Sequence, residues 1–326
     1  MSETAEPLFR IQLAADQLMA EHPPRVAVPN KQVVFALAVP PGATHTGTIE
    51  CTRWPAWPLP EMIPAAVGPA PVMVTSDLFE YGVGPPETMA WHLNFAHSDL
   101  FVAYASSLFA QDEMQVAEHP ALGAVREALV AKGLEHWTRV GNEPTPILIT
   151  GVERRCRIAT APDAAAGRPN GLYGNAFARA SAAAVRAATT AILPPTISNI
   201  IAMEAPTGGS GRYSGTEITS ILTTACTGFR AAVNESRGYR TIIHTGFWGC
   251  GAYGGDRELM GLLQLLAARA AGVHTVRFHA FDSAGVEVMA RALRMVESFG
   301  AGELPTATIV QRVVDRGYAW GVSDGN

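Results

Sequence analysis

The sequence predicts an α/β protein in which a mixed central sheet is flanked by helices. Short apolar runs typical of buried strands occur at residues 72–78, 89–95, 146–151, 197–204, 239–244 and 274–281. Between and after them, longer amphipathic segments predict helices at residues 120–132, 175–193, 216–237, 256–271 and 283–299. Strands that alternate with helices indicate a layered α/β domain with a mostly parallel or mixed sheet.

The first 68 residues have a different character. Residues 1–22 place Leu8, Ile11 and Leu18 at roughly helical spacing, which predicts an amphipathic helix. Prolines are frequent at residues 23–71, so we expect a loop-rich segment there, with one strand at residues 32–39. The sequence therefore predicts a helical and loop-rich extension (1–68) that wraps the core of a second region (69–326) carrying the functional site.

The composition excludes several classes of protein. The chain has 326 residues and a net charge of −5, without the basic runs that a nucleic-acid surface needs. It shows no signal-peptide pattern and no long apolar stretch, so we expect no membrane association. The four cysteines form no C-x-x-C pair and the nine histidines no H-E-x-x-H motif. We therefore expect no metal, no cofactor and a reducing, cytoplasmic environment.

The most informative stretch is the glycine-rich run at residues 244–256, which reads H-T-G-F-W-G-C-G-A-Y-G-G-D. It follows a predicted strand and precedes a predicted helix. Glycines let the backbone approach a phosphate closely, and the first turn of a helix presents unpaired N–H groups to it. The run lacks both the Gly-Lys-Ser/Thr ending of a P-loop and the G-x-G-x-x-G spacing of a dinucleotide fold. It predicts an anion site of another kind, and a plain glycine turn is the alternative.

A second group of polar residues follows the predicted strand at 89–95. Asn94 and His97 lie at the end of this strand, and Gln111, Asp112 and Glu113 precede the helix predicted from residue 120. Neighbouring carboxylates are often solvated surface charge. They can also divide their roles, one protonated to assist a leaving group and one ionised to hold water or stabilise a cation. Glycoside hydrolysis commonly uses such pairs.

Both groups of residues resemble signatures of the poly(ADP-ribose) glycohydrolases, a branch of the macrodomain superfamily. The late family signature is approximately T-G-N-W-G-C-G-A-F-G-G-D, and residues 245–256 read T-G-F-W-G-C-G-A-Y-G-G-D. The early signature is V-D-F-A-N, a triple-glycine loop and Q-E-E. Here N-F-A-H at residues 94–97 and Q-D-E at residues 111–113 keep the family's spacing. The resemblance implies a macrodomain-like mixed sheet.

The chain departs from the family in the loop between the two early motifs. Residues 101–103 are Phe-Val-Ala where the family has three glycines, whose backbone N–H groups clasp the diphosphate and the distal ribose. We expect Phe101 to push this loop away or to close part of the pocket. Asn94 and Asp112 replace family acids, whereas Glu113 matches the family's central catalytic glutamate.

The resemblance implies a site for ADP-ribose in which Glu113 is the catalytic residue and Asp112 assists it. Phe247 replaces a family asparagine, and Phe281 or Phe278 is expected to stack on adenine. Tyr173 lies where relatives place a clasp, although a plain turn is favoured there. The residues implied at the ligand are Gln111, Asn94, His97, Thr245, Gly246, Phe247, Trp248, Gly249, Cys250, Gly251, Ala252, Tyr253, Gly254, Asp256 and Phe281.

Three functions fit this resemblance. The chain is expected to be an ADP-ribosyl hydrolase that acts on mono-ADP-ribosylated protein, including protein modified on arginine. A cationic ADP-ribosyl-guanidinium would pair with carboxylates that also orient water, and divergent macrodomains similar to this branch act on ADP-ribosyl-arginine. Degradation of poly(ADP-ribose) is an alternative that the altered glycine loop disfavours. Binding of ADP-ribose without catalysis is the third.

Overall fold

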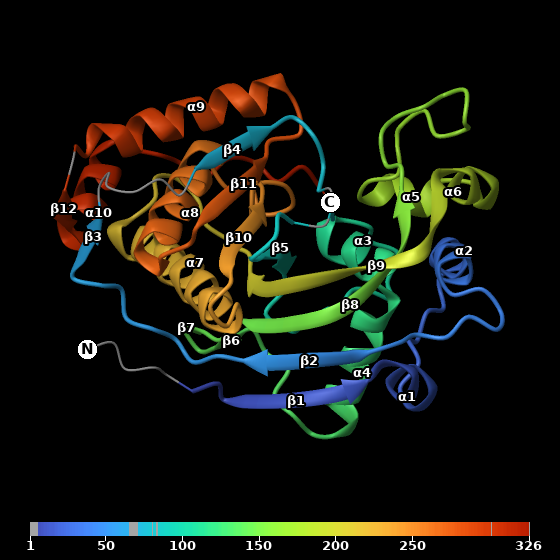
Figure 1. Cartoon of the computed structure of the whole chain (residues 1–326). Helices are drawn as coiled ribbons and strands as arrows, with labels where there is room; N and C mark the ends of the chain where they lie inside the picture. The colour runs from blue at the N-terminus through green and yellow to red at the C-terminus, as the bar shows by residue number, and fades with distance from the viewer. Residues whose placement is uncertain (1–5, 65–70, 80, 83, 301, 326) are drawn as a thin grey trace.

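The computed structural model describes residues 6–64, 71–79, 81–82, 84–300 and 302–325, and its centre is an eight-stranded mixed sheet (Figure 1). The strand order is β1 (Phe9–Ala14), β2 (Thr48–Arg53), β8 (Ile147–Ile158), β9 (Thr189–Glu204), β5 (Thr88–Ala96), β10 (Arg240–Thr245), β11 (Thr275–His279) and β4 (Val72–Thr75). The first four strands pair antiparallel, and β9, β5, β10, β11 and β4 run parallel. The α/β class with a mixed sheet is confirmed.

Helices cover both faces of this sheet. One apolar core contains side chains of α7 (Gly215–Glu235), α8 (Arg257–Ala271), α9 (Ser283–Ser298) and α10 (Thr306–Asp315). A second core, against the opposite face, contains α1 (Ala15–Glu21) and α4 (Pro120–Ala131). Successive side chains of β9 point to opposite faces of the sheet. Ile201 and Met203 pack in the first core, and Ile200 and Ala202 pack in the second.

Four shorter helices gather where β8 and β9 extend beyond the other strands (Figure 1). They are α2 (Pro29–Ala38), α3 (Gln111–Glu118), α5 (Asn175–Arg179) and α6 (Ala182–Ala188), and their apolar side chains form a third core. Two small ribbons complete the fold: β3 (Met62–Pro64) with β12 (Glu303–Pro305), and β6 (Arg139–Val140) with β7 (Glu143–Pro144). Within the described residues no helix combines the length and apolar character needed to cross a bilayer.

Three predictions about local structure were wrong. Residues 1–22 do not form one helix, because Phe9, Ile11 and Leu13 alternate with exposed residues and pair with β2 before α1 begins; residues 1–5 lie outside the described residues. Residues 32–39 are not a strand but belong to α2, which Pro29 opens at its first helical position. The single helix predicted at 175–193 is two short helices, α5 and α6, separated by extended residues 180 and 181, and β9 begins at the β-branched Thr189.

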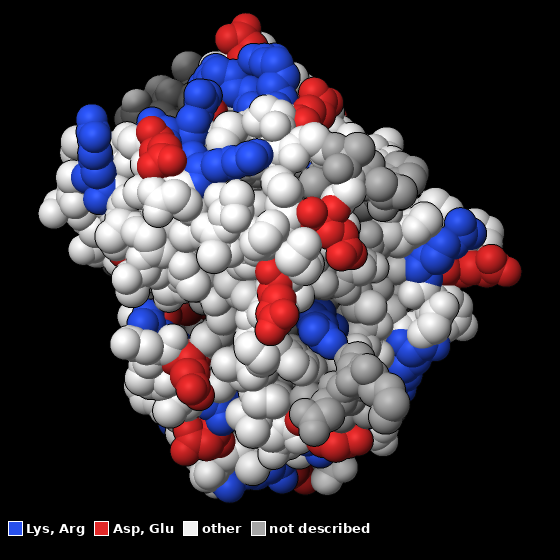
Figure 2. All heavy atoms as spheres, turned by 90° about the vertical axis from the view of Figure 1, so that its left-hand side faces the viewer, with Lys and Arg blue, Asp and Glu red and all other residues white. Residues whose placement is uncertain are grey.

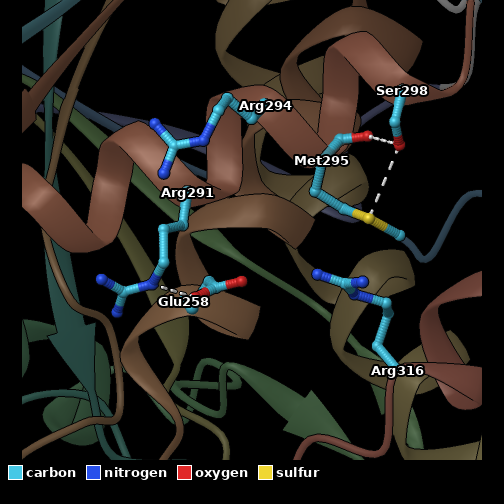
Figure 3. Close-up of a pocket in the computed structure, with 6 residues that line it drawn as sticks. All are labelled: Glu258, Arg291, Arg294, Met295, Ser298 and Arg316. Carbon is cyan, nitrogen blue, oxygen red and sulfur yellow. Dashed lines mark hydrogen bonds and ion pairs between the residues drawn. The ribbon is translucent and has the colours of Figure 1, made fainter.

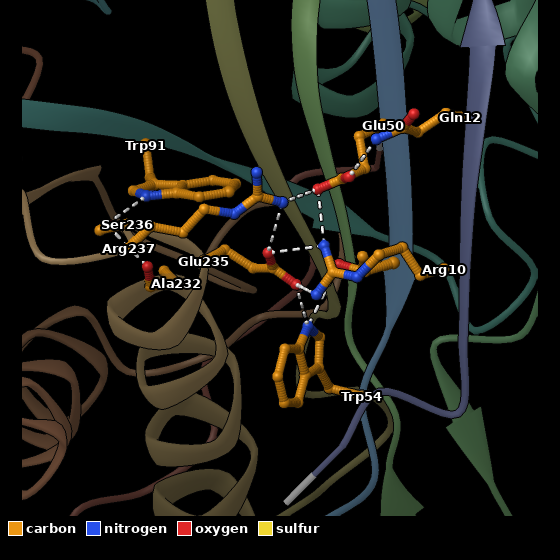
Figure 4. Close-up of polar contacts among 10 residues, drawn as sticks. Arg10, Gln12, Glu50, Trp54, Trp91, Ala232, Glu235, Ser236 and Arg237 are labelled. Carbon is orange, nitrogen blue, oxygen red and sulfur yellow. Dashed lines mark hydrogen bonds and ion pairs between the residues drawn. The ribbon is translucent and has the colours of Figure 1, made fainter. Parts of the chain in front are cut away.

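Ion pairs attach the β1–β2 edge of the sheet to the C-terminal end of α7 (Figure 4). Arg10 donates to Glu50 at 2.6 Å and, through both terminal nitrogens, to Glu235 at 2.8 and 3.0 Å. The Trp54 indole N–H donates to Glu235 at 3.1 Å, and Arg237 also pairs with Glu50. The N-terminal segment thus contributes two strands to the central sheet, while the proposed boundary at residue 68 stays a prediction.

We predict that Glu235→Ala lowers the free energy of unfolding by about 1–2 kcal/mol, since it removes one buried acceptor from the Arg10 guanidinium and from the Trp54 indole N–H, which keep only Glu50 and Thr52. Urea unfolding followed by circular dichroism measures this change. Glu297→Ala, at an exposed position of α9, should change stability by no more than about 0.5 kcal/mol. Equal effects of the two substitutions would show that this network does not hold the sheet edge.

Candidate functional site

The sequence-predicted site residues gather at the carboxyl ends of the parallel strands. Ala96 at the end of β5 is paired with Glu204 at the end of β9, and Thr245 at the end of β10 with Phe278 of β11. Parallel strands end at the same edge of a sheet, which is where open α/β sheets bind ligands. The loops after β5, β10 and β11 therefore meet at one edge.

The acid pair lies in the first turn of α3. The sequence places residues 111–113 in a connection before a helix that begins at residue 120, but the structure gives them a helix of their own, and α4 follows it at Pro120. Glu113 is 3% exposed, and its Oε2 accepts a hydrogen bond from the Ala110 N–H at 2.9 Å. This contact caps the helix and fixes the carboxylate near a helix N-terminus, where negative charge is favoured.

Asp112 is buried beside Glu113. Its Oδ1 accepts a hydrogen bond at 3.0 Å from the Nδ2 of Asn94, which is fully buried in β5. Burial, followed by the charge of Glu113, raises the pKa of Asp112 well above the usual range, although Asn94 and the charge of Lys31 oppose the shift. Near neutral pH the pair therefore holds a proton, the arrangement that acid–base chemistry requires.

Gln111 and His97 make local contacts at the same edge. The Gln111 side chain bridges the end of β5, because its Nε2 donates to the Leu93 carbonyl at 3.0 Å and its Oε1 accepts from the Phe95 N–H at 2.7 Å. His97 is exposed, and its Nδ1 accepts from the Asp99 N–H at 3.0 Å. Gln111 thus supports the strand end, and His97 stabilises the turn that follows it.

Phe101, in the loop that lacks the family's glycines, does not close a pocket as we expected. Its side chain is fully buried in the core formed with α4, together with that of Tyr104. Its backbone has φ of 53°, in the left-handed region that favours glycine. The loop therefore keeps a glycine-like backbone at this position while the ring packs inward, where apolar burial stabilises it.

The glycine-rich loop between β10 and α8 is held by buried polar contacts. The Thr245 hydroxyl donates to Gln264 of α8, whose Nε2 donates to the Gly246 carbonyl at 3.0 Å. Gly249 has φ of 74°, and a Cβ there would lie 2.9 Å from Cδ of Pro206. Glycine is therefore required at this position, both by the backbone conformation and by the close approach of the loop after β9.

The aromatic residues of this loop divide between the core and the site. Phe247 and Trp248 are 4% and 0% exposed, so a ligand would meet these two residues through their backbone and not through their rings. Tyr253 is half-buried, and its pKa is raised by burial and by the charges of Asp112 and Glu113. The charges of both acids thus act on Tyr253, the one aromatic ring of the loop that is not fully packed in the core.

Asp256 and Cys250, at the end and in the middle of the loop, have structural roles. Asp256 caps α8 through a hydrogen bond from the Leu259 N–H to its Oδ1 at 2.8 Å, and burial raises its pKa. Cys250 donates weakly to the Trp248 carbonyl, and burial raises the pKa of its thiol, which argues against a nucleophilic role. Gly251, Ala252 and Gly254 lie between these positions.

Residues 321–325 run along the glycine-rich loop. The Gly321 N–H donates to the Gly254 carbonyl at 2.7 Å, and the Asn175 side chain donates to the Gly325 carbonyl at 2.8 Å. Oδ2 of Asp324 would lie only 3.0 Å from a Cβ on Gly251. A carboxylate of this chain thus lies against the glycines that are predicted to hold an anion, which the sequence did not indicate.

Tyr173 joins this segment to the acid pair. Burial and the charges of Asp324 and Glu113 raise the pKa of Tyr173 to about 12, and the backbone of Gln111 acts against this shift. The sequence favoured a plain turn at Tyr173, yet its side chain reaches the first turn of α3. It therefore borders the region between the acid pair and residues 321–325.

A cavity of about 610 Å³ opens beside the site. Phe281, which is 45% exposed, lines it together with Phe95, Gln111 and Asp77. Phe281 has φ of 66°, and its ring also lies beside Gly246. Sequence analysis missed Asp77, because nothing in its local sequence distinguishes an acid after β4 from an ordinary turn residue.

A second, smaller pocket of about 270 Å³ lies between α8, α9 and the end of α10 (Figure 3). It is lined by Arg291, Arg294 and Arg316, with Glu258 accepting a hydrogen bond from Arg291 at 2.6 Å. Figure 2 shows Lys and Arg side chains gathered at the top of this face of the molecule, where Figure 1 places α9. None of the predicted site residues lines this pocket, so it is separate from the candidate site.

Buried histidines behind the site are neutral packing groups. The rings of His92 and His244 stack with centroids 4.4 Å apart, and those of His244 and His279 lie 5.3 Å apart. Burial lowers the pKa of His92 to about 3 and that of His244 to about 2. In the part of the chain that the structure describes, no group of three His, Cys, Asp or Glu residues is arranged to hold a metal ion.

Comparison with known proteins agrees with the fold and the motifs. Residues 171–288 match the family model of poly(ADP-ribose) glycohydrolase, which has a macrodomain fold. No curated protein matches the sequence. The region that carries the glycine-rich loop is thus similar to the macrodomain of the poly(ADP-ribose) glycohydrolases, in keeping with the motifs.

Several solved structures are also similar. The poly(ADP-ribose) glycohydrolase of Thermomonospora curvata has 16% identity and a TM-score of 0.45, and the similarity covers 85% of this chain and 88% of that one. A mutant of the Deinococcus radiodurans enzyme in complex with ADP-ribose has 13% identity and a TM-score of 0.41, with coverage of 88% and 95%. At these values the similarities do not define the chemistry of this chain.

The raised pKa of Asp112 predicts a pH-dependent stability. The folded state binds this proton more tightly than the unfolded state does, so stability falls as the pH rises from the usual carboxyl range to the raised pKa. Asp112→Asn cannot lose the proton. Between the usual carboxyl pKa and the raised pKa, the stability of the wild type should therefore fall relative to that of Asp112→Asn. The difference between their free energies of unfolding should change by up to about 1.4 kcal/mol per pH unit. Urea unfolding at pH 5, 6, 7 and 8 measures the difference, and parallel curves would contradict a buried proton.

Proposed function

We propose that this protein is an ADP-ribosyl hydrolase that removes ADP-ribose from mono-ADP-ribosylated proteins, including proteins modified on arginine. The observation that supports the proposal is the burial of the Asp112–Glu113 pair at the N-terminus of α3, whose charges also act on Tyr253 of the glycine-rich loop. The match of residues 171–288 to the poly(ADP-ribose) glycohydrolase model supports the choice of ADP-ribose as the ligand.

In this proposal each part of ADP-ribose has a separate binding element. The glycine-rich loop and the N-terminus of α8 hold the pyrophosphate through backbone N–H groups, which suit an anion. The exposed ring of Phe281 offers a stacking face for adenine, and Asp77 in the same cavity can accept a hydrogen bond from the adenine amino group. The distal ribose then lies toward the acid pair, with Tyr253 beside it.

Glu113 is the proposed general base. Its Oε2 is fixed by the Ala110 N–H, while its Oε1 makes no hydrogen bond within the described residues. Oε1 takes a proton from water as the water oxygen bonds to C1″ of the distal ribose. The bond from C1″ to the arginine nitrogen breaks, and the released guanidine takes up the proton. For an oxygen-linked substrate, the proton held by Asp112 can pass to the leaving oxygen.

We predict that Glu113→Gln lowers kcat at least about a hundredfold and leaves the Kd for ADP-ribose nearly unchanged, because it removes the base but keeps the shape and polarity of the side chain. Release of ADP-ribose from arginine-linked and acid-linked substrates and from automodified polymer measures kcat, and calorimetry measures Kd. Glu287→Gln, at an exposed position of α9, is the matched control.

The same assay separates the functions. Release from a mono-ADP-ribosylated class alone supports the proposal, and release from polymer alone would establish the polymer-degrading alternative. Tight binding of ADP-ribose without release from any substrate would show a binding module. Full activity of Glu113→Gln would remove the assigned role of this residue.

The position of Asp324 yields a prediction about ligand affinity. Its carboxylate lies against Gly251, where the pyrophosphate is proposed to bind, so ADP-ribose has to displace residues 321–325. Ending the chain after Trp320 should tighten the Kd for ADP-ribose about tenfold, and Asp324→Asn should do so in part, because like charge no longer competes for the loop. The control is Asp315→Asn, at an exposed position. Weaker binding after truncation would mean that this segment holds the ligand.

A further inference from the structure

The N-terminal helix α2 presents two neighbouring buried polar side chains toward the candidate site. Asn30 is 8% exposed and Lys31 is 0% exposed. Fully buried lysines are rare because removing an ammonium group from water is costly unless it is paired or hydrogen-bonded. The burial of Lys31 therefore calls for partners, and the structure supplies them from two sides.

The first partners of Lys31 are backbone carbonyls of the loop that lacks the family's glycines. Its Nζ donates to the carbonyl of Tyr104 at 2.7 Å and to that of Ala103 at 3.3 Å. Its ammonium group also lies 5.9 Å from the centre of the Phe109 ring, in the segment that leads into α3. The lysine thus fixes the loop 101–107 through two carbonyls that follow Phe101, whose own ring packs in the core.

Asn30 secures the opposite side of the site in the same way. Its Nδ2 donates to the carbonyls of Phe177 and Ala180 at 2.8 and 2.9 Å, at the end of α5. This segment directly follows Tyr173, on whose pKa the backbone of Gln111 acts. Two adjacent residues of α2 therefore hold the two segments that flank the first turn of α3.

The charges of the two carboxyl groups also act on Lys31. Burial lowers the pKa of Lys31 to about 8, and the charges of Glu113 and Asp112 act against that shift. In return, the charge of Lys31 lowers the pKa of Asp112, as does that of Arg126. The ammonium group is therefore a fully buried cation whose charge acts on Asp112, and it comes from a segment outside the matched region.

We propose that Lys31, with Asn30 beside it, is a positioning residue for the hydrolysis proposed above: it fixes the loop 101–107 where the family uses three glycines, and its charge sets how readily the Asp112–Glu113 pair ionises. The inference rests on the proposed function. It implies that the N-terminal segment is part of the catalytic unit, with Lys31 acting through the loop and the acid pair.

Two substitutions separate the hydrogen bonds of Lys31 from its charge. Lys31→Gln keeps a donor for the loop carbonyls but removes the charge, and Lys31→Met removes both. Without a neighbouring cation a buried carboxyl group ionises less readily. The acidic limb of the pH profile of kcat should therefore move to higher pH by about one unit in Lys31→Gln. Lys31→Met should show the same shift and a further fall in kcat of about tenfold or more, with KM changed less.

The control is Lys132→Gln, since Lys132 is the other lysine of the chain and is exposed. It should leave the pH profile and kcat unchanged. Asn30→Ala should lower kcat without moving the pH profile, because it carries no charge. An unshifted profile in Lys31→Gln would overturn the proposal, and this variant carries the test if Lys31→Met does not fold.

Carboxyl-carbon NMR titration of Asp112 and Glu113 gives a readout that needs no substrate. The titration midpoint of the pair should rise in Lys31→Gln relative to the wild type, and an unchanged midpoint would contradict the role of the charge. If the wild type hydrolyses no ADP-ribosyl substrate, the proposed function fails, yet the NMR shift still decides whether Lys31 controls the pair.

Discussion

The site depends on the burial of two neighbouring carboxyl groups in the first turn of α3. Adjacent buried acids repel each other and are costly to remove from water, so their surroundings have to compensate. The structure does this with a hydrogen bond from the Ala110 N–H to Glu113, another from Asn94 to Asp112, and the ammonium group of Lys31. An arrangement of this kind is costly for stability and useful for chemistry, which is why perturbed acids cluster at functional sites.

Phe101 and Lys31 together compensate for the absence of the three glycines in the loop at residues 101–107. A glycine loop can approach a ligand because it has no side chains, whereas this loop carries Phe101 with φ of 53° and buries the ring in the core. Lys31 then fixes the carbonyls at the other end of the turn. The flexibility that glycines would give this loop is thus replaced by the packing of Phe101 and the hydrogen bonds of Lys31. The loop keeps its turn but presents side chains where the family has none.

The sequence predicted the parts of the fold that local patterns determine. We predicted the apolar strands β5, β10 and β11 and the amphipathic helices α7, α8 and α9 because the spacing of their apolar residues matches the faces that the fold buries. The errors fell where tertiary pairing overrides the local pattern. Phe9, Ile11 and Leu13 read as helical until β2 pairs with them, and residues 32–39 read as a strand until packing on α6 selects a helix. The glycine-rich loop and the acid pair were recognisable because their residues are contiguous in the sequence and form short motifs. Lys31, Asp77 and Asp324 were missed, because each reaches the site from a distant segment whose own sequence carries no signal.

The central claim is that the acid pair faces the distal ribose of a bound ADP-ribose. A crystal structure of the Glu113→Gln variant with ADP-ribose tests it most directly. The account predicts the pyrophosphate against residues 246–254, residues 321–325 displaced from the loop, and C1″ of the distal ribose within reach of a water held by the side chain at position 113. A nucleotide bound elsewhere, or a distal ribose turned away from α3, would contradict it.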